Sequence, residues 1–267
     1  MTDPLHLALL FLAATVAGAV NSAAGGGTLL TFPALLAAGV SPVLANGTST
    51  VALAPGSLSA FWGYRHEIRN DRQHLLWMGC VSVFGGVLGA LLAGRVGDTL
   101  FSHLVPLLIF GATALFIVQD PIRRWLARRG VAAIGQAETK TPRFPPGPMF
   151  FQFFVALYGG FFGAGIGILM LAALGMMGMD NIHRMNGIKN FAAISINGVA
   201  AVTFALLGKV EWKLALLMAV GAIIGGYGGA GLARRVGQAN VRRFVIVIGL
   251  TIGLSTARNE LLKWLGH

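Results

Sequence analysis

The segment NSAAGGGTLLTFPALLAAGVSPVLANGTST, which runs from Asn21 to Thr50, breaks an otherwise apolar chain. Three consecutive glycines, Gly25 to Gly27, let the backbone turn sharply because they carry no Cβ atom. The apolar run that follows, residues 28–39, is shorter than the roughly 20 residues that a membrane-spanning helix needs. A polar cluster, Asn46 to Thr50, lies four residues after Pro42. The segment therefore predicts a short helix that begins after the glycines and forms a hairpin with the polar-faced helix that follows.

The composition of the whole chain indicates a membrane protein. Of its 267 residues, 55% are hydrophobic and 11% are charged, and the mean hydropathy is +0.74. A soluble chain carries about 25% charged residues, and a soluble domain could not bury this much apolar surface. The apolar run after Asp3 lacks the basic start of a secretory signal peptide, so we assign it as the first membrane segment. We expect an all-α, polytopic membrane protein.

Charge and motifs exclude several classes of function. The net charge of +11 does not indicate nucleic-acid binding, because the basic residues lie at the ends of apolar segments rather than in a stripe. Cys80 is the single cysteine, which rules out an internal disulfide or a Cys-rich metal site. The histidines have no metal-ligand spacing, and no Ser/His/Asp or paired-carboxylate arrangement appears. We expect no enzyme, no cofactor, no metal and no nucleic-acid partner.

An internal repeat divides the chain into two halves. Asn46-Gly47 recurs 140 residues later as Asn186-Gly187, and Arg95-Val96-Gly97 recurs at the same spacing as Arg235-Val236-Gly237. Several glycines keep this spacing without a gap, which glycine content alone does not explain. The predicted domains are a first transmembrane repeat (1–118), a basic, proline-rich linker (119–148) and a second transmembrane repeat (149–267).

Parity and charge predict that the two repeats are inverted. The first half has five apolar pieces, at about 5–22, 28–39, 43–61, 74–94 and 99–118. The number of membrane crossings is odd whether the hairpin crosses the membrane twice or re-enters. The second half is therefore inserted in the opposite orientation. With both termini outside, the linker and the other dense clusters of Lys and Arg fall inside, as the positive-inside rule requires. Two inverted repeats, each with a glycine-broken helical hairpin, are typical of secondary transporters.

The two glycine breaks and a duplicated polar stripe form the predicted substrate site. The first backbone N–H groups of a helix favour an anion, and irregular backbone at membrane depth is tolerated where it lines a cavity. After the first break, Asn46, Ser49, Thr50 and Ser57 share one helix face. Their repeat mates are Asn186, Lys189, Asn190 and Asn197. The alternative is that these polar groups only hold helices together.

Lys189 stands out because its repeat mate is the neutral Ser49. A charge at membrane depth is costly and indicates function. We predict that Lys189 supplies a fixed positive charge for an anionic substrate. The alternative is that it snorkels to the membrane surface or pairs with Asp180.

The motifs around both breaks resemble those of one known family. The sequence A-G-x-x-N-S-x-A-G-G-G at Ala17–Gly27, A-N-G-T-S-T at Ala45–Thr50 and P-G-S at Pro55–Ser57 are similar to the sulfite exporter TauE/SafE family, as is N-G-I-K-N at Asn186–Asn190. The resemblance covers the chain outside the linker. It implies a multi-pass transporter of the bacterial inner membrane that carries sulfite, sulfoacetate or another organosulfur anion. Thiosulfate-carrying relatives use several cysteines, so that branch does not fit a chain with Cys80 alone.

These observations predict a secondary transporter, in the direction of export, of a small organosulfur anion. The alternatives are a carrier of a different small anion such as a carboxylate, an anion channel, and a non-transporting scaffold. The predicted partners are the anion and the lipid bilayer, with homodimerisation left open. The residues predicted to bind the substrate are Asn21, Gly25, Gly26, Gly27, Thr28, Asn46, Ser49, Thr50, Ser57, Gly163, Gly165, Gly167, Asn186, Lys189, Asn190 and Asn197.

Overall fold

The computed structural model describes residues 3–23, 25–63, 68, 71–133, 146–177, 179, 182–236 and 238–265. Every regular element among these residues is a helix, which confirms the all-α prediction. The helices of the first half are α1 (Pro4–Ala23), α2 (Thr28–Ala37), α3 (Pro42–Gly63), α4 (Arg72–Arg95) and α5 (Asp98–Ala133). Those of the second half are α6 (Pro146–Phe161), α7 (Ile166–Met176), α8 (Ile182–Leu206), α9 (Trp212–Val236) and α10 (Gln238–Leu265).

The helix boundaries follow the repeat spacing. Helices α3, α4 and α5 begin 140 residues before α8, α9 and α10, respectively. Two boundaries fall inside the segment predicted to be a linker (119–148): α5 continues to Ala133, and α6 begins at Pro146. The Arg, Ala and Leu residues of this segment are strong helix formers, so α5 continues in spite of Pro121.

Four of the described helices are long and apolar enough to cross a membrane. They are Pro4–Asn21, Arg72–Arg95, Asp98–Val118 and Arg184–Leu206. Large apolar side chains are exposed along their surfaces, among them Leu9 on α1, Leu88 on α4 and Leu107 on α5. Such faces suit a lipid environment, because water would not solvate them. The chain is a multi-pass membrane protein.

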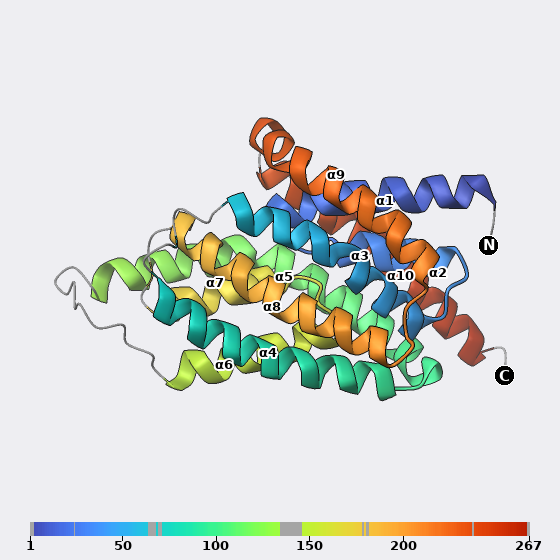
Figure 1. Cartoon of the computed structure of the whole chain (residues 1–267), viewed down its shortest axis with the longest axis horizontal. Helices are drawn as coiled ribbons and strands as arrows, with labels where there is room; N and C mark the ends of the chain where they lie inside the picture. Colours follow the sequence, from blue (N-terminus) through green and yellow to red (C-terminus); the bar gives the residue numbers. More distant parts are fainter. Residues whose placement is uncertain are drawn as a thin grey trace.

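The helices form two bundles that each exchange one helix with the other half of the sequence (Figure 1). The first bundle contains α1, α2, α3 and α9, and the second bundle contains α6, α7, α8 and α4. Helix α9 packs along α1 and α3, and its repeat counterpart α4 packs along α6 and α8. Helices α5 and α10 pack against each other. This exchange of partners is the pattern that a two-fold relation between the halves would produce.

The short helices α2 and α7 fold back from the breaks. Helix α2 has 10 residues and α7 has 11, so each extends about 15 Å, half of the hydrocarbon core. Ala37 at the end of α2, and Gly39 just after it, line a small pocket together with His6 and Leu7 of α1, so α2 returns toward the N-terminal end. Figure 1 shows α2 near that end and α7 near the opposite end.

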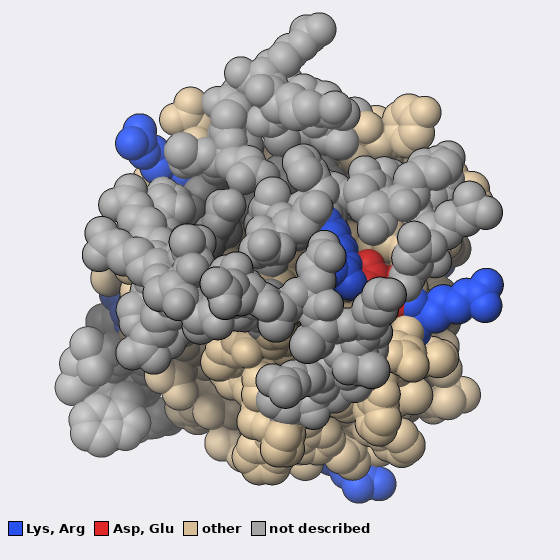
Figure 2. All heavy atoms as spheres, turned by 90° about the vertical axis from the view of Figure 1, so that its left-hand side faces the viewer, with Lys and Arg blue, Asp and Glu red and all other residues tan. Residues whose placement is uncertain are grey.

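The two ends of the molecule differ. In Figure 1 both chain termini lie at one end, whereas α5 ends and α6 begins at the other. We call these the terminal end and the linker end. Figure 2 shows the linker end, where Lys and Arg side chains lie at several places and acidic atoms show only beside a basic side chain. The inversion of the repeats in the membrane stays a prediction.

Candidate functional site

The two glycine breaks meet at the centre of the molecule. The first break is Gly25–Gly27 and the second break is Gly163–Gly165. Gly25 and Gly26 have φ of 73° and 108°. Gly163 and Gly165 have φ of 81° and 79°. Backbone in this left-handed region favours glycine. A Cβ atom on Gly25 would lie 3.7 Å from the Cα of Gly167, so the first break faces the first turn of α7, directly after the second break.

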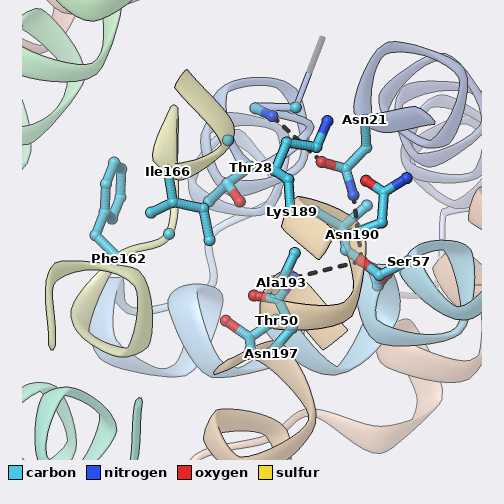
Figure 3. A pocket seen from close by; sticks show the side chains of 15 residues that line it. Asn21, Thr28, Thr50, Ser57, Phe162, Ile166, Lys189, Asn190, Ala193 and Asn197 are labelled. Atoms are coloured by element: carbon cyan, nitrogen blue, oxygen red, sulfur yellow. Dashed lines mark hydrogen bonds between the residues drawn. The ribbon is translucent and has the colours of Figure 1, made fainter. Parts of the chain in front are cut away.

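A small cavity of about 30 Å³ lies between the breaks and the polar stripes of α3 and α8 (Figure 3). This volume admits about two water molecules, so in this conformation the site encloses only a compact group. The first bundle lines it with Asn21, Gly25, Gly26, Thr28, Thr50, Leu53 and Ser57. The second bundle contributes Phe162, Gly163, Ile166, Gly167, Lys189, Asn190, Ala193 and Asn197.

A hydrogen-bond network around Ser57 joins the walls of the cavity. The Nδ2 atoms of Asn21 and Asn197 each donate to Ser57 Oγ at 3.4 Å. Asn21 also accepts a hydrogen bond from the Gly26 backbone N–H at Oδ1, at 3.2 Å, which holds the first break. Ser57 and Asn197 are repeat mates, so the two polar stripes touch each other at equivalent positions.

Lys189 and Asn190 bring hydrogen-bond donors to the cavity. Lys189 is 5% exposed, and Figure 3 shows its side chain extending toward the side of the cavity where Asn21 lies. The Nδ2 atom of Asn190 is buried and has no hydrogen-bond partner among the described residues. The residues that line the cavity include no Asp or Glu. A buried amide donor and a buried ammonium beside a cavity without carboxylates favour an anion.

The alternative partner for Lys189, Asp180, lies outside the described residues. Within the described ranges, the ion pairs join Asp71 to Arg184 and to His74, and Asp3 to His6. None of these pairs involves Lys189. Asp71 is 4% exposed and accepts from Arg184 Nε at 2.7 Å, so this pair connects α4 to α8 near the linker end.

Five of the residues predicted to bind substrate do not line the cavity; they are Gly27, Asn46, Ser49, Gly165 and Asn186. Gly27 packs against α1, where a Cβ atom would lie 2.7 Å from the Ala17 carbonyl oxygen. Ser49 turns away and shares a hydrogen bond of 2.5 Å with Thr31 on α2. Gly165 precedes α7 at its N-terminus. The amide of Asn46 donates to the Phe161 carbonyl at 2.8 Å. Asn186 is half-buried.

The sequence-based prediction missed four apolar residues that line the cavity: Leu53, Phe162, Ile166 and Ala193. Apolar residues in a membrane helix give no signal that separates a cavity wall from ordinary packing. For Ile166 the repeat gives such a signal, because its repeat mate is Gly26 and both residues line the cavity.

A wider groove of about 690 Å³ lies on the outer side of α2, against α5 and α10. Its polar lining consists of hydroxyl groups, from Ser102, Thr251, Ser255 and Thr256. Because none of its lining residues is charged, it lacks the fixed charge that holds an anion. The smaller cavity between the breaks is therefore the better candidate site.

Comparison with known proteins identifies the family. The model of the family described as sulfite exporter TauE/SafE matches residues 10–256. The chain is 29% identical to the "Probable membrane transporter protein ORF9" of Sinorhizobium sp over 270 residues, 98% of this chain and 97% of that protein. It is 28% identical to the "Probable membrane transporter protein YfcA" of Escherichia coli (strain K12) over 271 residues, 100% of this chain and 96% of that protein.

A third relative is a "Probable membrane transporter protein" of Haemophilus influenzae, 29% identical over 251 residues, 91% of each chain. These names are those of membrane transporters rather than enzymes, in agreement with the sequence-based prediction. No solved structure matches the chain. The chain belongs to the sulfite exporter TauE/SafE family of membrane transporters.

Proposed function

We propose that the protein is a secondary transporter that exports a small organosulfur anion, such as sulfite, sulfoacetate or another sulfonate, through the cavity between the two breaks. The observation that carries this proposal is Lys189, which is 5% exposed and lines a cavity that has no carboxylate among its lining residues. An uncompensated buried ammonium is unfavourable, so a site of this kind gains stability from a negatively charged occupant.

The two short helices contribute to the same electrostatic field. Helices α2 and α7 begin at Thr28 and Ile166, and both of these residues line the cavity. The N-terminus of each helix carries a partial positive charge and orphan N–H groups that attract an anion. Lys189, the Asn190 amide and the two helix ends therefore act on one small volume. A sulfite or sulfonate group, with several oxygen acceptors around one sulfur atom, suits donors that converge from several directions.

Titration calorimetry with purified protein in detergent tests the proposed substrate class. The panel is sulfite, sulfoacetate, a longer sulfonate and two dicarboxylates. We expect saturable binding of the sulfur oxyanions and weaker binding of the dicarboxylates. Preferential binding of a dicarboxylate would favour the alternative of a carboxylate transporter, and binding of none of the five would contradict the proposal.

A channel is the second candidate function, because the chain carries few ionisable groups at membrane depth to couple transport to protons. The two mechanisms differ in kinetics, since a carrier saturates and exchanges its substrate whereas an open pore does not. The small volume of the cavity, about 30 Å³, suits a carrier that encloses its substrate.

We also propose that both termini lie on the periplasmic side of the bacterial inner membrane and that the linker lies in the cytoplasm. The basic side chains at the linker end support this orientation (Figure 2). Reporter fusions at His267 and within residues 134–145 test it. A cytoplasmic signal is expected from the linker fusion and a periplasmic signal from the C-terminal fusion. A cytoplasmic C-terminus would contradict the inverted arrangement.

A further inference from the structure

We infer that Asn46 and Asn186 are paired gate residues that close the cavity alternately from its two sides. This inference rests on the proposed transport function. Asn46 lies on α3, one helical turn before Thr50, which lines the cavity. Because α3 begins at Pro42 near the terminal end, Asn46 stands between the cavity and that end. It is fully buried, so no solvent reaches it in this conformation.

The hydrogen bond of Asn46 joins the two bundles. Its Nδ2 atom donates to the Phe161 carbonyl oxygen at 2.8 Å, which connects α3 of the first bundle to α6 of the second. Phe161 is the last residue of α6, so its carbonyl oxygen accepts no hydrogen bond from an N–H group of the same helix. The bond from Asn197 to Ser57 also joins the two bundles, but it links two repeat mates and so favours neither half. Two other polar contacts stay within one bundle. Thr48 Oγ1 accepts from the Glu211 N–H, next to α9 of the same bundle, and Gln152 on α6 donates to Ser82 on α4.

The repeat places the same amide at the mirrored position. The mate of Asn46 is Asn186, one helical turn before Asn190 on α8, and the mate of Phe161 is Asn21 on α1. Asn186 therefore lies between the cavity and the linker end, where α8 begins. Asn186 is only half-buried, and no hydrogen bond between it and the Asn21 carbonyl occurs in the part of the chain that the structure describes.

Equivalent residues thus make the bond on one side only. In a transporter with two-fold related halves, the opposite state is reached when each half adopts the arrangement of the other. In that state Asn186 donates to the Asn21 carbonyl and Asn46 releases Phe161. The Oδ1 atom of Asn46 is buried and has no partner among the described residues. A buried acceptor without a hydrogen bond costs free energy, so Asn46 stabilises the present conformation only weakly. A weak interaction of this kind suits a gate that opens in every transport cycle.

Cysteine labelling measures the two states without any substrate. The background variant is Cys80→Ser, and the probe is Ala193→Cys, at a small residue that lines the cavity. A membrane-impermeant maleimide is applied from the terminal side, and the labelled fraction is measured. We expect Asn46→Ala to raise labelling from this side about two- to tenfold, which is the effect of one neutral hydrogen bond on an equilibrium. Asn186→Ala should lower it by a similar factor.

Two further variants separate a gate from a general structural role. Thr48→Val removes a hydrogen bond two residues from Asn46 that stays within the first bundle, and it should leave labelling unchanged. The double variant Asn46→Ala with Asn186→Ala should label like the parent, because the two effects cancel. Asn46→Ser replaces Asn46→Ala if the latter does not give a single symmetric peak in size-exclusion chromatography.

Opposite shifts for the two single variants support the inference. Shifts in the same direction, or no shift in either variant, would overturn it. The result is independent of the binding panel, because labelling uses no anion. If opposite shifts occur in a protein that binds none of the five anions, the gate stands and the proposed substrate class fails.

Discussion

The two glycine breaks share one left-handed glycine, Gly25 and its repeat mate Gly165, but are held by different side chains. At the first break, Asn21 accepts from the Gly26 N–H at 3.2 Å. At the second, the Tyr158 hydroxyl donates to the Ala164 carbonyl at 2.9 Å. The mate of Tyr158 is Gly18, where a Cβ atom would overlap the Ala222 carbonyl of α9. The fold therefore requires the breaks themselves, whereas each half stabilises its own break with the side chains that its packing allows.

The polar stripes divide their roles in a similar way. Ser49 bonds to Thr31 inside the first bundle, whereas its mate Lys189 reaches the cavity. One half thus supplies neutral polar groups and the other supplies the positive charge. If this division is correct, changes at equivalent positions of the two halves should have unequal effects.

The largest effect is expected at the first break. Gly26→Leu should abolish transport, because Gly26 has φ of 108° and a Cβ atom would overlap the Phe116 ring. Gly165→Leu should also abolish transport, but Gly165→Ala should retain part of it, since its Cβ atom would lie 3.4 Å from Leu115 Cδ1. Transport assays at matched amounts of folded protein measure the difference. Gly111→Ala is the control, because nothing lies within 4 Å of its Cβ position.

Full activity of Gly26→Leu would show that the first break is not part of the transport path. Equal losses for Gly26→Ala and Gly165→Ala would show that backbone strain alone, and not the space near Phe116, decides the effect.

The next largest effect is expected at Lys189. Lys189→Met keeps the length of the side chain and removes its charge. Leaving a buried charge without its partner costs about 3–5 kcal/mol, so calorimetry should show anion affinity lower by roughly a hundredfold or more. Lys189→Arg should be only partly tolerated, because the guanidinium differs in shape and hydration.

Ser49→Ala is the matched control for Lys189→Met, since Ser49 occupies the equivalent position and does not line the cavity. It should change the affinity less than about threefold. If Lys189→Met also stays within that limit, Lys189 is a structural residue and the two halves do not differ in the way proposed.

A smaller effect is expected from Tyr158→Phe. The change leaves the buried Ala164 carbonyl without its donor, which costs about 1–3 kcal/mol. The thermal unfolding midpoint should fall by several degrees. The anion affinity should stay close to that of the parent, because Tyr158 does not line the cavity. Asn21→Ala should lower both the unfolding midpoint and the anion affinity, since Asn21 holds the first break and lines the cavity. A loss of affinity in Tyr158→Phe as large as in Asn21→Ala would contradict this distinction.

Much of the fold was predictable because glycine and proline mark the ends of its helices. The predicted short segment 28–39 is found as Thr28–Ala37, and the predicted 74–94 is found as Arg72–Arg95. The pairing of α1 with α9 and of α4 with α6 was not predictable. Small residues on many helices allow close approach, and their sequence pattern does not say which helix approaches which.

The site was predictable as a region rather than as a set of contacts. Residue type and spacing bring Thr50, Ser57, Lys189 and Asn197 to one cavity. They do not show that Ser49 turns to Thr31 or that Asn46 bonds to a backbone carbonyl of α6, because such choices depend on partners distant in sequence. Leu53 and Phe162 were missed since an apolar wall looks like any packed helix face.

Counterflow in proteoliposomes tests whether the protein is an anion carrier whose site contains Lys189. Vesicles that contain the purified protein are loaded with unlabelled sulfite, diluted into radiolabelled sulfite, and compared with vesicles that contain Lys189→Met. We expect transient, saturable accumulation of label in the parent and a large loss in the variant at low sulfite. Flux that rises linearly with concentration and shows no counterflow, or equal flux in both proteins, would contradict an anion carrier whose site contains Lys189.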